Sequence, residues 1–188
     1  MDFQKLLTRW NVTLSQDDIL QCWSEPHRAY HGVAHLADLL EQIEGHNPLP
    51  QKERDMLTLA AIFHDIIYNP RRTDNEVRSA ELFLQCISMD KDSPDIQEIA
   101  TIIRDTKTHK PSTPLSAIFC HMDTAIVRRP YPDLLLWEEG IRREYDHLPG
   151  IAYVVGRVRF LEKMRCKFPE NAAALRMLQK KLLFPWKK

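Results

Sequence analysis

The sequence predicts an all-helical protein, built as one helical bundle, and three observations carry this prediction. Apolar residues recur at steps of three and four along most of the chain, which is the period of a helix rather than of a strand. The chain has only five glycines, and it contains neither Asn-Gly nor Asp-Gly, the pairs typical of tight hairpins. Its twelve prolines are spread so that they divide the chain into helices of ordinary length.

Four apolar stripes mark the clearest helices, and each stripe should face a shared core. In chain order they are Leu36, Leu39, Leu40 and Ile43; Met56, Leu59, Ala60 and Phe63; Ile96, Ile99, Ala100 and Ile103; and Val154, Val158 and Leu161. A further helix start is predicted at Thr73-Asp74-Asn75-Glu76, because a capping threonine is followed three residues later by glutamate.

Length and charge bound the domain organisation and the partners. With 188 residues, no repeat and no low-complexity linker, the chain is expected to form a single domain over 1–188. Lys and Arg (26) balance Asp and Glu (26), so neither dedicated nucleic-acid binding nor an anionic membrane partner is expected. Lys180-Lys181 and Lys187-Lys188 make only a modest basic end.

Apolar runs and cysteines bear on the location of the protein. No apolar run is long enough to span a membrane, and the first residues lack the apolar core of a signal peptide. The four cysteines form no Cys-x-x-Cys pair, which disfavours a zinc-thiolate site and a disulfide framework. We therefore expect a cytoplasmic protein with reduced thiols and no membrane association.

Histidines gather at two places where chemistry is expected. His27, His31 and His35 follow one another at four-residue intervals, which puts His31 and His35 on one face of a predicted helix. His64-Asp65 ends the apolar run 59–63, so both side chains should lie beside a buried helix and need a polar partner there. Two simpler explanations stay open: an i,i+4 histidine pair arises by chance, and a buried His-Asp hydrogen bond needs no metal.

Asp123 repeats this pattern in a third apolar helix, between Ile118-Phe119-Cys120 and Ala125-Ile126-Val127. Three helices that each offer a histidine or an aspartate toward the interior predict a convergent polar site.

This order, a histidine, a His-Asp doublet about thirty residues later and a distant aspartate, resembles the HD-domain superfamily of metal-dependent phosphohydrolases. Flanking segments look like a small bacterial family of predicted phosphohydrolases in that superfamily, and together they cover nearly the whole chain. The segments are 26–31 with His35, 61–68, 74–76 with Ser79-Ala80, Thr106 with His109, and 141–145.

The resemblance implies an HD-type bundle with a metal site in its central cleft. It implies that the metal ligands are His31, His64, Asp65 and Asp123. One departure concerns the last ligand, because relatives have Asp-x-Asp-Leu where this chain has His121-Met122-Asp123-Thr124. If the first position of that motif is the family ligand, His121 takes its place and the metal preference shifts toward ions that favour nitrogen.

Two imidazoles and two carboxylates suit a divalent ion such as Mn, Fe, Co, Ni, Zn or Mg. Four ligands on an ion that accepts six leave room for water, which the ion acidifies enough to supply hydroxide near neutral pH. The resemblance implies that Asp65 also orients this water. His35, Glu76 and His109 are expected to line the cleft without being obligatory ligands of the first ion, and His35 and Glu76 to assist catalysis.

A phosphate ester needs positive charge for its oxygens. The residues expected to supply it are Arg28, also a catalytic candidate, Arg71, Arg104, Lys107 and His109. The expected function is hydrolysis of a small phosphorylated substrate, a nucleotide or another metabolite, by a monomer or homodimer. The alternatives are a metal- or nucleotide-binding regulatory module of HD fold without turnover, and a di-iron HD-fold oxygenase. The oxygenase needs additional ligands, and only two histidines, His109 and His121, lie between the doublet and Asp123.

Overall fold

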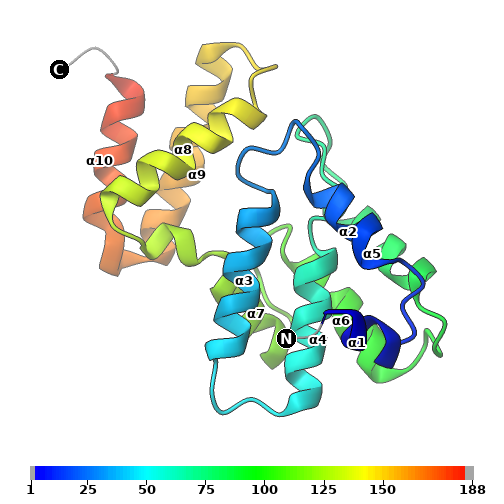
Figure 1. Ribbon diagram of the computed structural model, residues 1–188. Coiled ribbons are helices and arrows are strands. Elements are labelled where there is room, and N and C mark those ends of the chain that lie inside the picture. The colour runs from blue at the N-terminus through cyan, green and yellow to red at the C-terminus, as the bar shows by residue number, and fades with distance from the viewer. Residues whose placement is uncertain (1–2, 185–188) are drawn as a thin grey trace. The chain divides into compact units, whose positions relative to one another are not determined.

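The computed structural model describes residues 3–184, and the fold within them is helical, which confirms the predicted all-helical class (Figure 1). The described residues contain no strand, only an isolated antiparallel bridge between Val12 and Ile87. No helix in this part of the chain is long and apolar enough to cross a membrane. Lys187-Lys188 lie outside the described residues.

The helices form two compact units, Met1–Asp123 and Thr124–Lys188. The first contains α1 (Phe3–Arg9), α2 (Gln16–Trp23), α3 (Val33–Gly45), α4 (Gln51–Phe63), α5 (Asn75–Cys86), α6 (Pro94–Asp105) and α7 (Pro114–Asp123). The second contains the 3-10 helix η1 (Ala125–Arg128), α8 (Tyr131–Glu144), α9 (Gly150–Lys167), the 3-10 helix η2 (Pro169–Asn171) and α10 (Ala172–Leu183). The expectation of one domain over 1–188 stays a prediction.

Helix α4 is the centre of the first unit. It packs against α3, α5, α6 and α7, and every residue from Asp55 to Phe63 is buried. A helix that is apolar on most of its circumference is stable only when neighbours surround it, which explains this position. The predicted stripes on α3, α4 and α6 face this core, with Leu40 the one member that is only partly buried.

The start of α5 differs from the prediction. The N-cap is Asp74, one residue after the expected threonine, and no side chain caps the helix. The Asp74 carboxylate instead accepts two hydrogen bonds from the Arg72 guanidinium, at 2.7 and 2.6 Å. With Asp74 at the N-cap, Glu76 stands at the second helical position and not at the third, so the expected capping box of Thr73 and Glu76 does not form.

In the second unit α10 packs against α8 and α9. The predicted apolar stripe of α9 is one residue out of register, because Val154 and Val158 are only half-buried while Tyr153 and Arg157 are buried. Arg157 is stabilised in the interior by the Glu138 carboxylate, 2.7 Å from its Nε, and by the ring of Trp137, whose centroid lies 4.1 Å from its Cζ. A paired arginine thus occupies the buried position that the apolar pattern assigned to valine.

Candidate metal centre

The chain positions His64 by ending α4 there. His64 is the C-cap of α4, its Nδ1 lies 3.0 Å from the carbonyl oxygen of Ala61, and it is 1% exposed. A carbonyl only accepts hydrogen bonds, so Nδ1 carries the proton in the neutral ring and Nε2 offers its lone pair. Trp23 fixes the end of the helix by donating from Nε1 to the carbonyl of Ile62, at 2.9 Å.

Three ligand atoms from three helices meet in one place. His35 Nε2 lies 3.3 Å from His64 Nε2 and 3.1 Å from Asp123 Oδ1, and His64 Nε2 lies 3.6 Å from that same oxygen. Two ligand atoms that each lie roughly 2.1 Å from an ion, with a ligand–ion–ligand angle of about 90–110°, are roughly 3.0–3.4 Å apart. Two sides of the triangle formed by His35, His64 and Asp123 fall in this range and the third, at 3.6 Å, is slightly longer, so the three atoms could hold a metal ion.

Asp65 adds a fourth group beside the triangle. Its Oδ2 lies 3.3 Å from His64 Nε2, and the residue is buried in the turn that follows α4. The four side chains come from α3, from the end of α4 and its following turn, and from the end of α7. We call His35, His64, Asp65 and Asp123 the His/Asp cluster.

The electrostatics of the cluster are those of ionised carboxylates held close to imidazole. Burial alone would lower the pKa of His64, but Asp65 and Asp123 outweigh it and raise that pKa well above its usual value. Burial would raise the pKa values of Asp65 and Asp123, yet the neighbouring histidines lower both well below the usual range. Both carboxylates are therefore negative at neutral pH, and a cation is required among them, either a proton on His64 or a metal ion.

His31 lies beside the cluster, outside the triangle. The structure places it before α3, because Gly32 is the extended N-cap of that helix, so the expected common helical face of His31 and His35 does not exist. Its ring stacks on Tyr68 with centroids 4.5 Å apart, and it contributes to the lowered pKa of Asp65. The three described side chains whose ligand atoms are spaced for a metal ion are His35, His64 and Asp123. From the sequence, His35 is predicted to assist catalysis and not to bind the metal.

Arg28 is engaged by the backbone around the cluster. It donates to the carbonyls of Asp65 at 2.7 Å, Ile66 at 3.0 Å and His31 at 3.0 Å, and its Nε donates to the Glu25 carboxylate. Its Nη2 also forms an ion pair with Glu25, and the side chain is 0% exposed. Arg28 therefore joins the turn around His31 to the turn after His64, and its guanidinium is buried in these contacts.

His109 is the one further candidate that the structure brings to the cluster. Its Nε2 lies 2.8 Å from Asp123 Oδ2, the oxygen that does not make the contacts to His35 and His64. The four remaining candidates make no hydrogen bond or ion pair with the described members of the cluster; they are Arg71, Glu76, Arg104 and Lys107. Arg71, Arg104 and Lys107 are exposed, and Lys107 donates to the carbonyl of Thr73 at 2.7 Å.

The sequence left open whether His121 or Asp123 belongs to the site. Asp123 lies in the cluster, whereas His121 is exposed on α7. Residues two positions apart in a helix point about 200° away from each other, so only one of His121 and Asp123 can face the interior.

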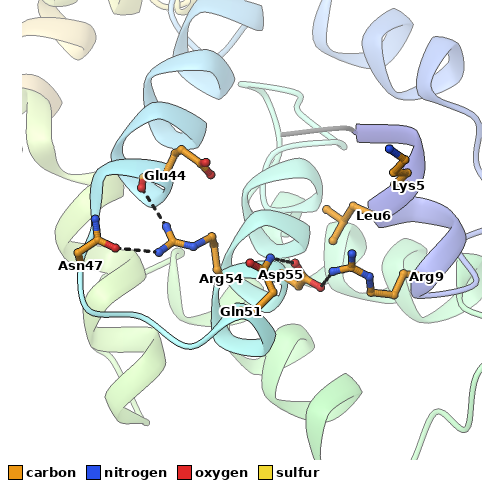
Figure 2. Close-up of a pocket in the computed structure, with 8 residues that line it drawn as sticks. All are labelled: Lys5, Leu6, Arg9, Glu44, Asn47, Gln51, Arg54 and Asp55. Carbon is orange, nitrogen blue, oxygen red and sulfur yellow. Dashed lines mark hydrogen bonds and ion pairs between the residues drawn. The ribbon is translucent and has the colours of Figure 1, made fainter.

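The first unit also contains a cavity of about 620 Å³ at the other end of α4, and it has a structural explanation (Figure 2). Asp55 is buried there and accepts hydrogen bonds from Arg9 at 2.6 Å and Gln51 at 2.7 Å. Arg54 donates to the carbonyl of Glu44 at 3.0 Å and to the side chain of Asn47 at 3.2 Å. These contacts link α1, α3 and α4, and no member of the His/Asp cluster lines the cavity.

Comparison with known proteins leaves the candidate site to be argued from its own geometry. No protein-family model matches the chain, no curated protein matches it, and no solved structure matches it.

Proposed function

We propose that the His/Asp cluster binds one divalent metal ion and that the protein uses it to hydrolyse the phosphate ester of a small substrate. The observation that carries this proposal is the triangle of His35 Nε2, His64 Nε2 and Asp123 Oδ1, with sides of 3.1 to 3.6 Å. Two nitrogen and two carboxylate ligands suit the divalent ions Mn, Fe, Co, Ni, Zn and Mg, and they need no thiolate.

The residues around the cluster support this chemistry. When bound, the ion acidifies a water molecule and neutralises charge on phosphate oxygens. Asp65 is adjacent to His64, so its carboxylate can accept a hydrogen bond from such a water and orient it. His109 fixes Asp123 by binding its second oxygen, and Arg28 fixes the two turns that carry His31 and Asp65.

The reaction type and the fold family are proposed on the resemblance of the order His, His-Asp, Asp to HD-domain phosphohydrolases. Our proposal departs from that pattern in one place, since we assign the first ligand to His35 in place of His31. Arg71, Arg104 and Lys107 remain the candidates for holding substrate phosphate. A nucleotide or other phosphorylated metabolite as substrate, a monomeric or homodimeric state and a cytoplasmic location belong to the same proposal.

Metal analysis joined to an activity screen tests the proposal. We expect protein purified without chelator to contain about one equivalent of a divalent metal and to hydrolyse an aryl phosphate or nucleotides with Mn, Co, Ni or Mg. The variants His35→Ala, His64→Ala and Asp123→Asn should lose both properties. His46→Ala and His147→Ala are the controls, because both histidines lie outside the cluster.

Each other outcome points to a defined alternative. Metal binding without turnover on any phosphate ester would favour the regulatory module. Loss of metal in His31→Ala, with metal retained in His35→Ala, would restore the ligand set that the sequence predicts. Equal losses in the two control variants would indicate general unfolding and remove the support for a metal site.

A further inference from the structure

The second unit contains a cavity unrelated to the His/Asp cluster. The helices α9 and α10 pack side by side (Figure 1). The cavity lies along them and has a volume of about 500 Å³. Six residues line it: Arg165 from α9, and Ala172, Ala173, Arg176, Met177 and Lys180 from α10. This volume lies within the range of roughly 300–1,000 Å³ that is typical of small-molecule sites.

The charge of the lining is entirely positive. Three of the six residues are cationic, and no carboxylate is present among the described residues that line the cavity. Arg176 and Lys180 form no ion pair with any described residue, and they stand one helical turn apart, where like charges repel. An anion between the two side chains would remove this repulsion.

Arg165 forms a fixed part of the lining. Its Nη1 donates to Glu162 at 2.6 Å and to Gln179 at 3.0 Å, which fixes the guanidinium between the two helices. Its charge is therefore paired with Glu162. Among the described residues that line the cavity, the cations without an ion pair are Arg176 and Lys180.

The rest of the lining is apolar. Ala172 and Ala173 offer only methyl groups, and Met177 is 52% exposed beside them. Methionine adapts its shape and contacts aromatic rings favourably. The cavity therefore combines a cationic part with a flexible apolar part.

We propose that this cavity binds a small organic anion that carries a phosphate or phosphonate group on an apolar, ring-sized body. Arg176 and Lys180 bind the anionic group, and Met177 contacts the apolar body. The proposal is independent of the function proposed for the His/Asp cluster, because the lining residues all belong to the second unit.

Calorimetric titration of the full chain with phenylphosphonate, which a phosphatase does not hydrolyse, tests the cationic part. Because the His/Asp cluster is a second candidate for binding phosphonates, each titration is repeated in the His64→Ala background and in EDTA. We expect the double variant Arg176→Gln/Lys180→Gln to weaken binding at least about tenfold, since it removes two charge-assisted contacts.

The matched control is the double variant Lys163→Gln/Lys181→Gln. It removes the same charge from exposed positions of α9 and α10 that do not line the cavity, so its affinity should stay within about twofold of wild type. Equal weakening in both double variants would mean general attraction of anions and would overturn the proposal. So would undiminished binding in Arg176→Gln/Lys180→Gln, or loss of binding in His64→Ala.

A second pair of probes tests the apolar part. Phenylphosphonate should bind roughly tenfold more tightly than methylphosphonate, and Met177→Ala should reduce that ratio while leaving the affinity for methylphosphonate unchanged. Equal affinities for the two probes would overturn the assignment of an organic ligand. Binding of the chain to phosphatidic acid vesicles through Arg176 and Lys180, without binding of phenylphosphonate, would identify a lipid headgroup as the ligand and overturn the small-molecule assignment.

Discussion

His109 holds the Asp123 carboxylate through the oxygen that does not contact His35 and His64. To reach it, His109 adopts φ 50°, in the left-handed region that non-glycine residues rarely occupy. Backbone strain of this kind persists where surrounding contacts outweigh it, and here the 2.8 Å contact to Asp123 is the evident one. The residue thus has two separable properties, an unusual backbone conformation and a ring that fixes a proposed ligand.

Substitutions at His109 should separate these two properties. His109→Gly accepts the backbone conformation without a ring, so we expect it to fold well and to bind metal roughly ten- to a hundredfold more weakly. His109→Gln keeps an N–H donor at about the reach of Nε2, so it should recover part of that loss. Competition with a chelator of known affinity measures the effect, and the idea fails if His109→Gly binds metal like wild type.

The choice between His31 and His35 shows what residue patterns can and cannot predict. His64, Asp65 and Asp123 were identified from the sequence because each follows or interrupts an apolar run. The pair His31 and His35 was expected on one helix, but Gly32 is extended and α3 begins only at Val33. A glycine between two histidines is the signal that favours His35, since only that residue is then fixed by regular helix geometry.

At the scale of elements, the carboxylate of Asp55 connects α1 to α4. It is buried and accepts hydrogen bonds from Arg9 and Gln51 (Figure 2). It also accepts one from the indole Nε1 of Trp10, at 3.2 Å. The Trp10 indole is itself buried, so removal of the carboxylate leaves a donor without an acceptor. That penalty is larger than the net value of the hydrogen bond itself.

Asp55→Ala should therefore lower the free energy of unfolding by about 2–4 kcal/mol, and Asp55→Asn by less, because the amide oxygen still accepts from Trp10. Urea unfolding followed by circular dichroism measures both changes. Glu41→Ala, which removes an exposed carboxylate of α3, is the control and should lie within about 0.5 kcal/mol of wild type. A loss no greater than that of Glu41→Ala would show that the Asp55 contacts contribute little.

The register of α9 shows why an apolar stripe can mislead. Val154, Val158 and Leu161 fit the helical period, but the buried set is Tyr153, Arg157 and Leu161. Tyr153 donates to the Glu138 carboxylate, which Arg157 also contacts. The Tyr153 hydroxyl and Arg157 Nε are thus paired with Glu138 across two helices, and a period that counts only apolar residues cannot detect such pairing.

This pairing predicts a change of stability in alkali. Burial and the neighbouring Glu138 carboxylate raise the pKa of Tyr153, whereas an unfolded tyrosine titrates near about 10. Above that pH the unfolded state loses a proton that the folded state keeps, so Tyr153 reduces stability by at most about 1.4 kcal/mol per pH unit. Below pH 10 this contribution is constant.

Tyr153→Phe should remove this part of the pH dependence, and Tyr131→Phe should not. The measurement is urea unfolding between pH 9 and 11, with the slope of stability against pH compared among the three proteins. If the slope of Tyr153→Phe equals that of wild type, the hydroxyl of Tyr153 ionises alike in the folded and unfolded states.

At the scale of the whole molecule, the sequence predicts the helical class but not the two compact units. Helix periodicity and proline spacing are local properties, and they identified the class and several starts, such as Pro94 and Pro114 at the beginnings of α6 and α7. A division between Asp123 and Thr124 depends on contacts between distant residues, and no glycine or charge run marks it in the sequence. The same is true of Asp123 itself, whose partners come from α3, from the end of α4 and from the residues after α6.

The division predicts where a metal ion stabilises the chain. His35, His64, Asp65 and Asp123 all belong to the first unit, so binding energy stabilises that unit directly. At a free metal concentration of 100 times Kd the gain is about 2.7 kcal/mol, a slowing of about a hundredfold for amides that exchange only through unfolding. Hydrogen exchange with and without Mn²⁺ should show this protection in α3, α4 and α7, and little change in α9 and α10. The His35→Ala variant should show no protection in either unit. Equal protection of both units by Mn²⁺ would contradict the prediction and indicate that the chain unfolds as one cooperative body.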